Sequence, residues 1–291
     1  MNRHEPNPQP AADATRNSRV VPLVVAAALL MENLDSTVLT TAIPSIAPEL
    51  ATDPIHLKLA LTSYLMSLAV FVPASGWMAE RYAPRRVFMA AIAFFTVASV
   101  LCALAQTLPQ LVTARILQGI GGAMMTPVGR LVVVRSVERH NLVSALAWVT
   151  IPALIGPILG PPVGGFIVTY AHWRWIFLIN VPIGILGVFL AWRFLPDITL
   201  PPPRAFDRRG FALSGGGLSL LVIAAAFLGV GAGDAILASA SAVLGALCLW
   251  MYVRHAARTA EPWFDPEDLL LADDPARPGD HDLGIGSKRR G

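Results

Sequence analysis

The sequence carries little charge. Only 14% of its 291 residues are Asp, Glu, Lys or Arg, whereas a soluble globular domain carries about 25%. Hydrophobic residues make up 55% of the chain. A water-soluble protein of this length needs a charged surface to stay dispersed, so the composition excludes an ordinary soluble domain. The solvent that suits so apolar a chain is lipid.

Cysteine is scarce as well, and no metal-ligand spacing is present. Cys102 and Cys248 lie far apart within apolar stretches, where a free cysteine behaves as a small hydrophobic residue. The histidines are His4, His56, His140, His172, His255 and His281. They lie in tails or at the ends of hydrophobic runs and do not have the spacing of a metal site. We therefore expect no disulfide, no metal or other cofactor, and no enzymatic reaction.

Long hydrophobic runs are what the sequence has instead. Each is about 20 residues or longer, and a helix of that length, at about 1.5 Å per residue, crosses a hydrocarbon core about 30 Å thick. The alternation of a membrane barrel is absent, and a segment in lipid must satisfy its own backbone hydrogen bonds, so the runs predict helices. We predict an all-α, polytopic membrane helix bundle whose eight spans are Val20–Pro44, Leu57–Ala79, Arg86–Ala105, Leu111–Val134, Leu142–Thr169, Trp173–Leu195, Phe211–Gly231 and Ala235–Val253.

The first run is predicted to remain in the mature protein. The apolar part of a secretory signal peptide has about 7–15 residues. The run Val20–Pro44 is longer and contains Glu32, Asn33 and Asp35. A retained first helix therefore explains the run better than a cleaved signal peptide does.

The distribution of basic residues predicts the orientation of the chain. With the N-terminus in the cytoplasm, the cytoplasmic tail and loops up to residue 258 hold fourteen arginines, whereas the opposite side holds only Lys58 and Arg174. We therefore predict a multi-pass protein with a cytoplasmic N-terminus and the lipid bilayer around it. The same distribution explains the net charge of +3 without a nucleic-acid partner.

Polar stretches divide the chain into five predicted segments. These are a disordered cytoplasmic tail at 1–19, a six-helix unit at 20–195, a cytoplasmic linker at 196–210, two additional spans at 211–254, and a polar cytoplasmic tail at 255–291 that we also expect to be disordered. The layout is therefore six helices, a linker, two helices and a tail.

Ionisable residues inside the predicted spans are candidates for function, because each costs about 2.5–3.5 kcal/mol on insertion scales. Glu32 and Asp35 are three residues apart in the first span and share a helix face. Arg115 lies in the fourth span with Gln118 three residues later. An ion pair or a water-filled cavity shared by Asp35 and Arg115 would lower the cost of both. The alternative is a purely structural pair that fixes the first helix to the fourth.

The fifth span combines regularly spaced glycines with prolines. Its motif residues are Gly156, Pro157, Gly160, Pro161, Gly164 and Gly165. Glycines at every fourth position make a groove for close helix contact. Packing alone explains the glycines, but prolines bend a helix. We therefore predict a bent helix at a moving seam.

The loop after the second span is basic and also carries a carboxylate. It contains Gly76, Glu80, Arg81, Arg85 and Arg86. The orientation rule accounts for the arginines. It does not account for Glu80, which makes this loop a candidate site.

Together these stretches resemble the major facilitator superfamily and, within it, the fourteen-helix drug:proton antiporters. The segments that carry the resemblance are Leu34–Val38 with Ala42–Pro44, Gly76–Arg86, Leu111–Gly119, Gly156–Gly165 and Trp173–Pro182. They occur in the family's order, each in its expected helix or loop. The gate loop departs from the family pattern, because Glu80 stands for the usual aspartate and Ala83 for the usual glycine. Alanine lacks the conformational freedom of glycine in a turn.

The resemblance implies a transporter of the bacterial cytoplasmic membrane. It implies proton-coupled efflux of drug-like or other small organic molecules by alternating access. Asp35 and Arg115 would line the central cavity and take part in proton coupling, with Glu32 and Gln118 as further candidates. The loop that contains Glu80 would hold the cytoplasmic gate.

The resemblance covers residues 20–260, which correspond to the first six-helix half and the central helix pair of such a transporter. The chain then turns polar, which suggests a truncated or frame-shifted gene product as a hypothesis. A second chain that supplies the missing half is one alternative. An inactive or accessory membrane subunit is the other.

Overall fold

The computed structural model describes residues 9–198, 206–227 and 235–258. Regular structure within these residues is helical and consists of α1 (Gln9–Glu49), α2 (Pro54–Tyr82), α3 (Pro84–Leu104), α4 (Leu108–Ser136), the short helix η1 (Arg139–Asn141), α5 (Leu142–Tyr170), α6 (Trp175–Leu178), α7 (Asn180–Phe194), α8 (Arg208–Phe227) and α9 (Ala235–Arg258). Eight helical stretches in the described part of the chain are long and apolar enough to cross a membrane. The all-α class and the number of spans are therefore confirmed.

The turns between the first helices follow from local chemistry. The side chain of Asp53 accepts a hydrogen bond from the N–H of Ile55 at 2.7 Å and caps α2. Proline occupies the first position of α2 and of α3, where its missing N–H costs nothing. A single residue, Ala83, joins these two helices with φ 67° and ψ 136°. That conformation favours glycine, so the departure noted at this position places alanine where the backbone is strained.

The first helix is longer at both ends than predicted. It begins at Gln9, inside the segment predicted as a cytoplasmic tail, while residues 1–8 lie outside the described residues. It also continues through Pro44 to Glu49. Ile46 and Ala47 beyond that proline are buried, and their burial outweighs the one backbone hydrogen bond that the proline removes.

The sixth span is divided, which the sequence analysis did not predict. It consists of α6 and α7, separated at Ile179. Pro182 follows and has no N–H to donate to the carbonyl of Leu178, so the helix is weakest at this point. Further along, α8 begins at Arg208, inside the predicted linker, and α9 continues to Arg258, inside the predicted tail. The rest of that tail, residues 259–291, lies outside the described residues.

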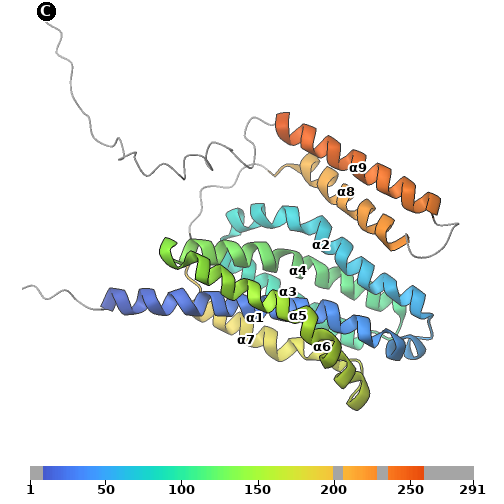
Figure 1. Cartoon of the computed structure of the whole chain (residues 1–291), viewed down its shortest axis with the longest axis horizontal. Helices are drawn as coiled ribbons and strands as arrows, with labels where there is room; N and C mark the ends of the chain where they lie inside the picture. The colour runs from blue at the N-terminus through green and yellow to red at the C-terminus, as the bar shows by residue number, and fades with distance from the viewer. Residues whose placement is uncertain (1–8, 199–205, 228–234, 259–291) are drawn as a thin grey trace, which may run out of the picture.

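Six spans form one bundle, in which α1 packs along α5 and α4 packs against both α2 and α3 (Figure 1). The α7 helix packs on α3 and α1. Two clusters of buried apolar side chains fill the bundle, one that includes Met31 and one that includes Val38. The polar residues of α1 between them, Glu32 and Asp35, therefore lie in a polar layer between two hydrophobic cores.

The remaining two spans, α8 and α9, form a hairpin beside α2 (Figure 1). Aromatic contacts attach α8 and the residues before it to α2: the ring centroids of Phe71 and Phe211 lie 6.1 Å apart, and those of Trp77 and Phe206 lie 4.9 Å apart. A Cβ added at Gly217 would lie 3.1 Å from the carbonyl oxygen of Gly245, which shows how closely α8 and α9 pack.

A contact between a carboxylate and an imidazole joins the two ends of this hairpin. The carboxylate of Asp207 accepts a hydrogen bond from the N–H of Gly210 at 2.9 Å and lies 3.0 Å from Nε2 of His255. The N–H of Gly210, together with His255, holds the pKa of Asp207 below its usual value. The start of α8 is thereby tied to the end of α9.

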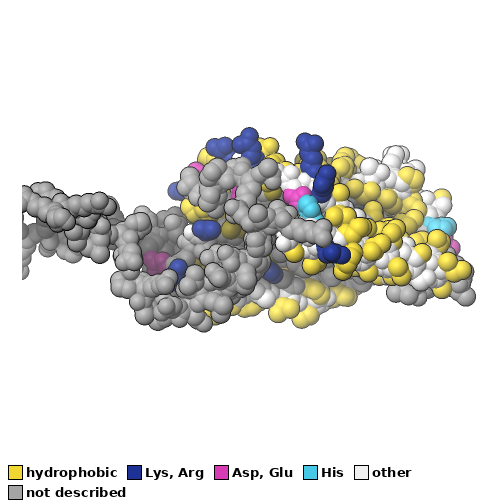
Figure 2. Space-filling model, turned by 90° about the horizontal axis from the view of Figure 1, so that it is seen from above, with side chains coloured by type: hydrophobic (Ala, Val, Ile, Leu, Met, Phe, Trp, Pro, Cys, Tyr) yellow, Lys and Arg dark blue, Asp and Glu magenta, His cyan; other side chains and the backbone are white. Residues whose placement is uncertain are grey.

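Hydrophobic side chains dominate much of the described surface in Figure 2, and the Lys and Arg side chains visible on that face lie toward one end of the long axis. Large apolar residues on the outside include Ile158 at 72% exposure and Val143 at 82%. Such a surface is unfavourable in water and suits the interior of a bilayer.

Candidate functional site

The centre of the bundle holds a buried ion pair. Nη1 of Arg115 in α4 donates a hydrogen bond to Oδ2 of Asp35 in α1 at 2.5 Å. Both side chains have no exposed surface. Of the two arrangements that would lower the cost of these charges, an ion pair or a water-filled cavity, the structure has the ion pair.

Gln118 of α4 and polar side chains from two further helices, α3 and α7, complete a network around this pair. Gln118 and Asn180 donate hydrogen bonds to Oδ1 of Asp35 at 2.9 and 2.7 Å. The carbonyl oxygen of Gln118 accepts a second bond from Nη1 of Arg115 at 2.6 Å. Its amide nitrogen also donates to the hydroxyl of Ser99 at 2.8 Å. The network thus joins α1, α3, α4 and α7.

The free-energy cost of burying the charges of Asp35 and Arg115 makes this cluster sensitive to the loss of any one partner. Taking two charges out of water costs several kcal/mol per ion, and only close geometry with further hydrogen bonds offsets that cost. The guanidinium of Arg115 also lies over the ring of Tyr64, 4.3 Å from its centroid. Its Nε and Nη2 have no hydrogen-bond partner among the described residues. Loss of Asp35 would therefore leave a buried cation supported mainly by an aromatic face.

A second carboxylate lies beside this network. Oε2 of Glu32 accepts a hydrogen bond from the hydroxyl of Thr126 at 3.0 Å. A Cβ added at Gly122 would lie 3.1 Å from the hydroxyl of Tyr64 and 3.5 Å from Oε1 of Glu32. The absence of a side chain at Gly122 leaves room on α4 for both the phenol of α2 and the carboxylate of α1.

The structure brings together all four residues predicted for proton coupling, but it encloses them. Glu32 is 9% exposed, Asp35 2%, and Arg115 and Gln118 not at all. In this conformation they line no open cavity. Of the two arrangements expected for the charged pair, the structure has the ion pair, and an open cavity around it remains a prediction for another conformation.

Sequence reasoning missed three members of this site. Ser99 and Asn180 bond to the network, and the buried hydroxyl of Tyr64 has no partner among the described residues. A polar side chain in the middle of an apolar span was the available signal for all three. That signal does not tell which helices meet, so it could not separate these residues from other polar residues in the spans.

The predicted gate loop contains one firm contact. Nη1 of Arg85 donates to the carboxylate of Asp197 at 2.8 Å, and its Nη2 bonds to the carbonyl of Trp192. This ties the start of α3 to the end of α7. Asp197 was not among the predicted residues, because it lies far away in the sequence.

The other predicted gate residues do not form one cluster. Gly76 and Glu80 lie within α2, and no ion pair in the described part of the chain joins Glu80 to an arginine of this loop. Arg81 lies near the ring of Tyr82, 5.9 Å from its centroid. Arg86 is exposed and lines a groove on the outside of the bundle.

The glycine motif of α5 packs directly on α1. Cβ atoms added at the three buried glycines would collide with side chains spaced by four residues on α1; the pairs are Gly156 with Asn33, Gly160 with Thr37, and Gly164 with Thr41. At Gly165, by contrast, an added Cβ would have no neighbour within 4 Å. Pro157 and Pro161 are exposed on the outer side. Three of the four motif glycines thus lie at a close contact with α1, whereas bending and movement of α5 stay predictions.

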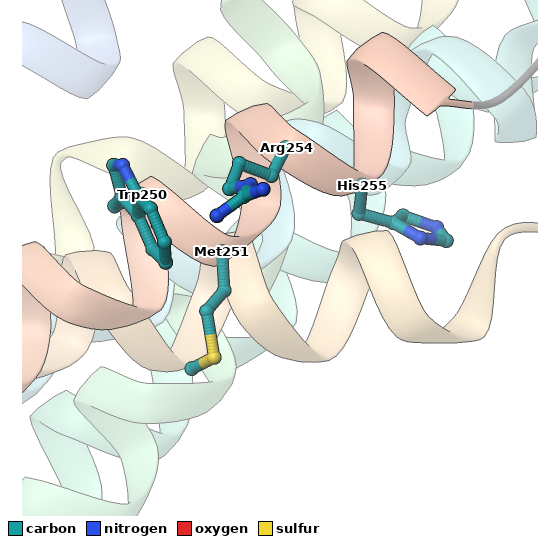
Figure 3. Close-up of a pocket in the computed structure, with 4 residues that line it drawn as sticks. All are labelled: Trp250, Met251, Arg254 and His255. Carbon is teal, nitrogen blue, oxygen red and sulfur yellow. The ribbon is translucent and has the colours of Figure 1, made fainter.

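A separate pocket of about 350 Å³ lies on α9. Figure 3 shows its lining residues, Trp250, Met251, Arg254 and His255, all from that helix. The guanidinium of Arg254 lies over the indole of Trp250, 4.7 Å from the ring centroid. Over the residues that the structure describes, no group of three or more His, Cys, Asp or Glu side chains could hold a metal ion.

Comparisons with known proteins place this chain in a family. The family model described as Major Facilitator Superfamily matches residues 25–257. A Klebsiella pneumoniae subsp. pneumoniae protein named "Putative multidrug resistance protein MdtD" is 45% identical over 242 residues, which cover 83% of this chain and 51% of that protein. A protein of the same name from Salmonella paratyphi B is 43% identical over 249 residues, covering 85% and 53%. The chain spans about half the length of the curated relatives it matches.

Solved structures share the fold at low sequence identity. The proton:xylose symporter XylE bound to 6-bromo-6-deoxy-D-glucose gives a TM-score of 0.57 at 15% identity, over 89% of this chain and 56% of that chain. The POT family transporter PepTSo gives 0.56 at 14% identity, over 84% and 55%. Likeness at these identities extends to the fold alone.

Proposed function

Because this chain belongs to the Major Facilitator Superfamily, we propose that its six-helix bundle acts as one half of a proton-coupled transporter of small organic molecules. The eight apolar helices of its described part make it a multi-pass membrane protein. Support for drug-like substrates comes from relatives named for multidrug resistance. In such transporters two halves rock about a site near the middle of the bacterial cytoplasmic membrane. A second chain supplies the other half, and in cells that express this chain a second copy of it fills that place.

The observation that carries the proposal is the buried pair of Asp35 and Arg115. A proton that binds a carboxylate removes its charge and changes which conformation has the lower free energy. Protonation of Asp35 would remove the counter-ion of Arg115 and weaken the bonds from Gln118 and Asn180. We assign Asp35, Arg115 and Gln118 to the coupling between proton binding and conformation.

Glu32 is the second carboxylate in this proposal. Its partner is the hydroxyl of Thr126, and no cation pairs with it among the described residues. Protonation of Glu32 therefore leaves no cation without a counter-ion. We assign proton exchange to Glu32 as well as to Asp35, with the hydroxyl of Tyr64 beside it.

The gate and the seam complete the proposal. We assign the α2–α3 loop to a gate on the side of the N-terminus, which we propose is cytoplasmic. The contact of Arg85 with Asp197 ties that loop to the end of α7 and keeps the loop attached to this half while the two halves move. The surface where α5 glycines meet α1 is the seam along which these helices change their tilt.

The test is dye accumulation in efflux-deficient bacterial cells that express this chain. Cells with the parent chain should accumulate less of a fluorescent lipophilic cation than cells with empty vector, and a protonophore should remove the difference. Asp35→Asn, Glu32→Gln and Arg115→Ala should each abolish it. The matched control is Glu49→Gln, which removes a carboxylate at the exposed end of α1, 42% accessible, and should leave the difference intact.

Equal accumulation in the parent, all variants and empty vector would contradict transport by this chain alone. In that case the chain is an inactive or accessory membrane subunit. Membrane fractions probed for each variant show that a negative result does not arise from lost insertion.

A further inference from the structure

A groove of about 440 Å³ lies on the outside of the bundle, where α2, α3 and α4 meet. Apolar side chains line most of it, among them Met78, Phe94, Ile120 and Met124. Phe94 is 42% exposed, so the groove opens to the surroundings of the bundle rather than to its core. In a membrane protein those surroundings are lipid.

One end of the groove is polar and cationic. Tyr82 is the last residue of α2 and Arg86 lies in the first turn of α3, and both line the groove. Because α2 ends and α3 begins here, this end lies at the boundary of the membrane. Phe94 is eight residues further along α3, about 12 Å deeper. The cation of Arg86 at the membrane boundary and the apolar part of the groove below it match an amphiphile with an anionic headgroup and a hydrocarbon tail.

The two consecutive arginines at this end differ in what they contact. Arg85 is engaged by Asp197 and by the carbonyl of Trp192. Arg86 is exposed, and no carboxylate in the described ranges lies within ion-pair distance of it. Its charge is therefore available to a partner outside the chain, at the depth where lipid phosphates lie.

We propose that this groove binds an anionic phospholipid, with an acyl chain along Met78 and Phe94 and its phosphate on Arg86. Arg86 then acts on the outside of the bundle, while Arg85 acts within it. Because the lipid contacts the ends of both α2 and α3, its binding stabilises the strained turn at Ala83 in the observed conformation. This inference does not depend on transport.

The experiment is native mass spectrometry of the purified full chain. The delipidated chain receives phosphatidylglycerol or phosphatidylcholine with identical acyl chains, and the retained lipid is counted. The parent should prefer phosphatidylglycerol about fivefold, the ratio that corresponds to about 1 kcal/mol per basic residue. Arg86→Gln should remove that preference, and Ala90→Phe, which fills the groove, should reduce retention of both lipids.

The matched control is Arg135→Gln, which removes an exposed arginine from the last turn of α4, outside the groove. It should leave the preference unchanged. Equal retention of both lipids by the parent overturns the proposal. So does an equal loss of preference in Arg86→Gln and Arg135→Gln, which indicates diffuse attraction, or undiminished retention in Ala90→Phe, which indicates headgroup contact alone. Thermal unfolding of each variant confirms that it is folded before lipids are counted.

Discussion

At the scale of single residues, the buried ionic network shows how strongly one side chain depends on its partners. Removing one member of a buried ion pair costs about 3–5 kcal/mol, because the other charge is left without compensation. Asp35 has partners from α4 and α7, so its loss would affect the contacts of several helices at once. A residue placed in this way can serve both stability and a change of conformation.

A second residue-scale feature is the turn at Ala83, where φ is 67°. Such a conformation costs a non-glycine residue about 1–2 kcal/mol, so Ala83→Gly should stabilise the chain by about 1 kcal/mol. Thermal unfolding in detergent is the measurement. The control is Ala171→Gly, at an exposed position with φ −142°, where glycine should instead be neutral or destabilising. A lower unfolding temperature for Ala83→Gly would show that the turn is not strained.

At the scale of the helix, the close contact between α1 and α5 depends on the absence of side chains at Gly156, Gly160 and Gly164. The threonines of α1 opposite Gly160 and Gly164 donate hydrogen bonds to carbonyls of their own helix, and Thr37 also donates to the carbonyl of Gly156 at 3.4 Å. Their hydroxyl oxygens lie against α5. The exposed prolines of α5 point away from this contact. The glycines of α5 therefore set the distance between α5 and α1. The exposed prolines of α5 lack the N–H that a helix backbone uses for hydrogen bonding.

This contact predicts a sharp difference between two neighbouring motif positions. A Cβ at Gly160 would overlap the side chain of Thr37, so Gly160→Ala should destabilise the chain by about 1–3 kcal/mol. Gly165→Ala adds the same methyl group into open space and should be neutral or stabilise by up to about 1 kcal/mol. Thr37→Ala should partly rescue Gly160→Ala. Unfolding temperatures of the two single variants and the double variant measure this, and equal effects at both glycines would contradict the assignment of the seam.

At the scale of the whole molecule, the described chain consists of a six-helix bundle and an attached hairpin. The hairpin contacts the bundle through α8, which packs on α2, while α9 packs on α8. The polar network lies entirely within the bundle. The hairpin can therefore change its position on α2 without disturbing that network.

Docking of the hairpin depends on Gly215. A Cβ there would lie 3.3 Å from the side chain of Val70, so Gly215→Leu should displace α8 from α2. Phe71→Cys with Phe211→Cys, in a chain whose native cysteines are replaced by alanine, reports docking through a short bifunctional crosslink. We expect that crosslink to be lost in Gly215→Leu and kept in Gly216→Leu, because Gly216 has no neighbour within 4 Å. A crosslink that survives Gly215→Leu would contradict this docking surface.

The sequence by itself determined the all-α class, the eight spans and the residues that lipid disfavours, because lipid imposes a length and a hydrophobicity on every span. It also indicated that Asp35 and Arg115 would share an ion pair or a water-filled cavity, since each needed compensation for its charge. Only the tertiary structure decided that Gln118, Ser99 and Asn180 complete their network. Hydrogen bonds between helices depend on which faces meet at which depth, and the pattern within one helix does not contain that information.

The same distinction applies to the α2–α3 loop. The arginines of the loop were apparent from the sequence, because their charge marks one side of the membrane. Their different partners were not apparent, since Asp197 lies far along the chain and reaches Arg85 only after α7 has packed on α3. Composition and spacing thus placed the helices in the membrane, and the packing of the helices then determined which charged groups meet.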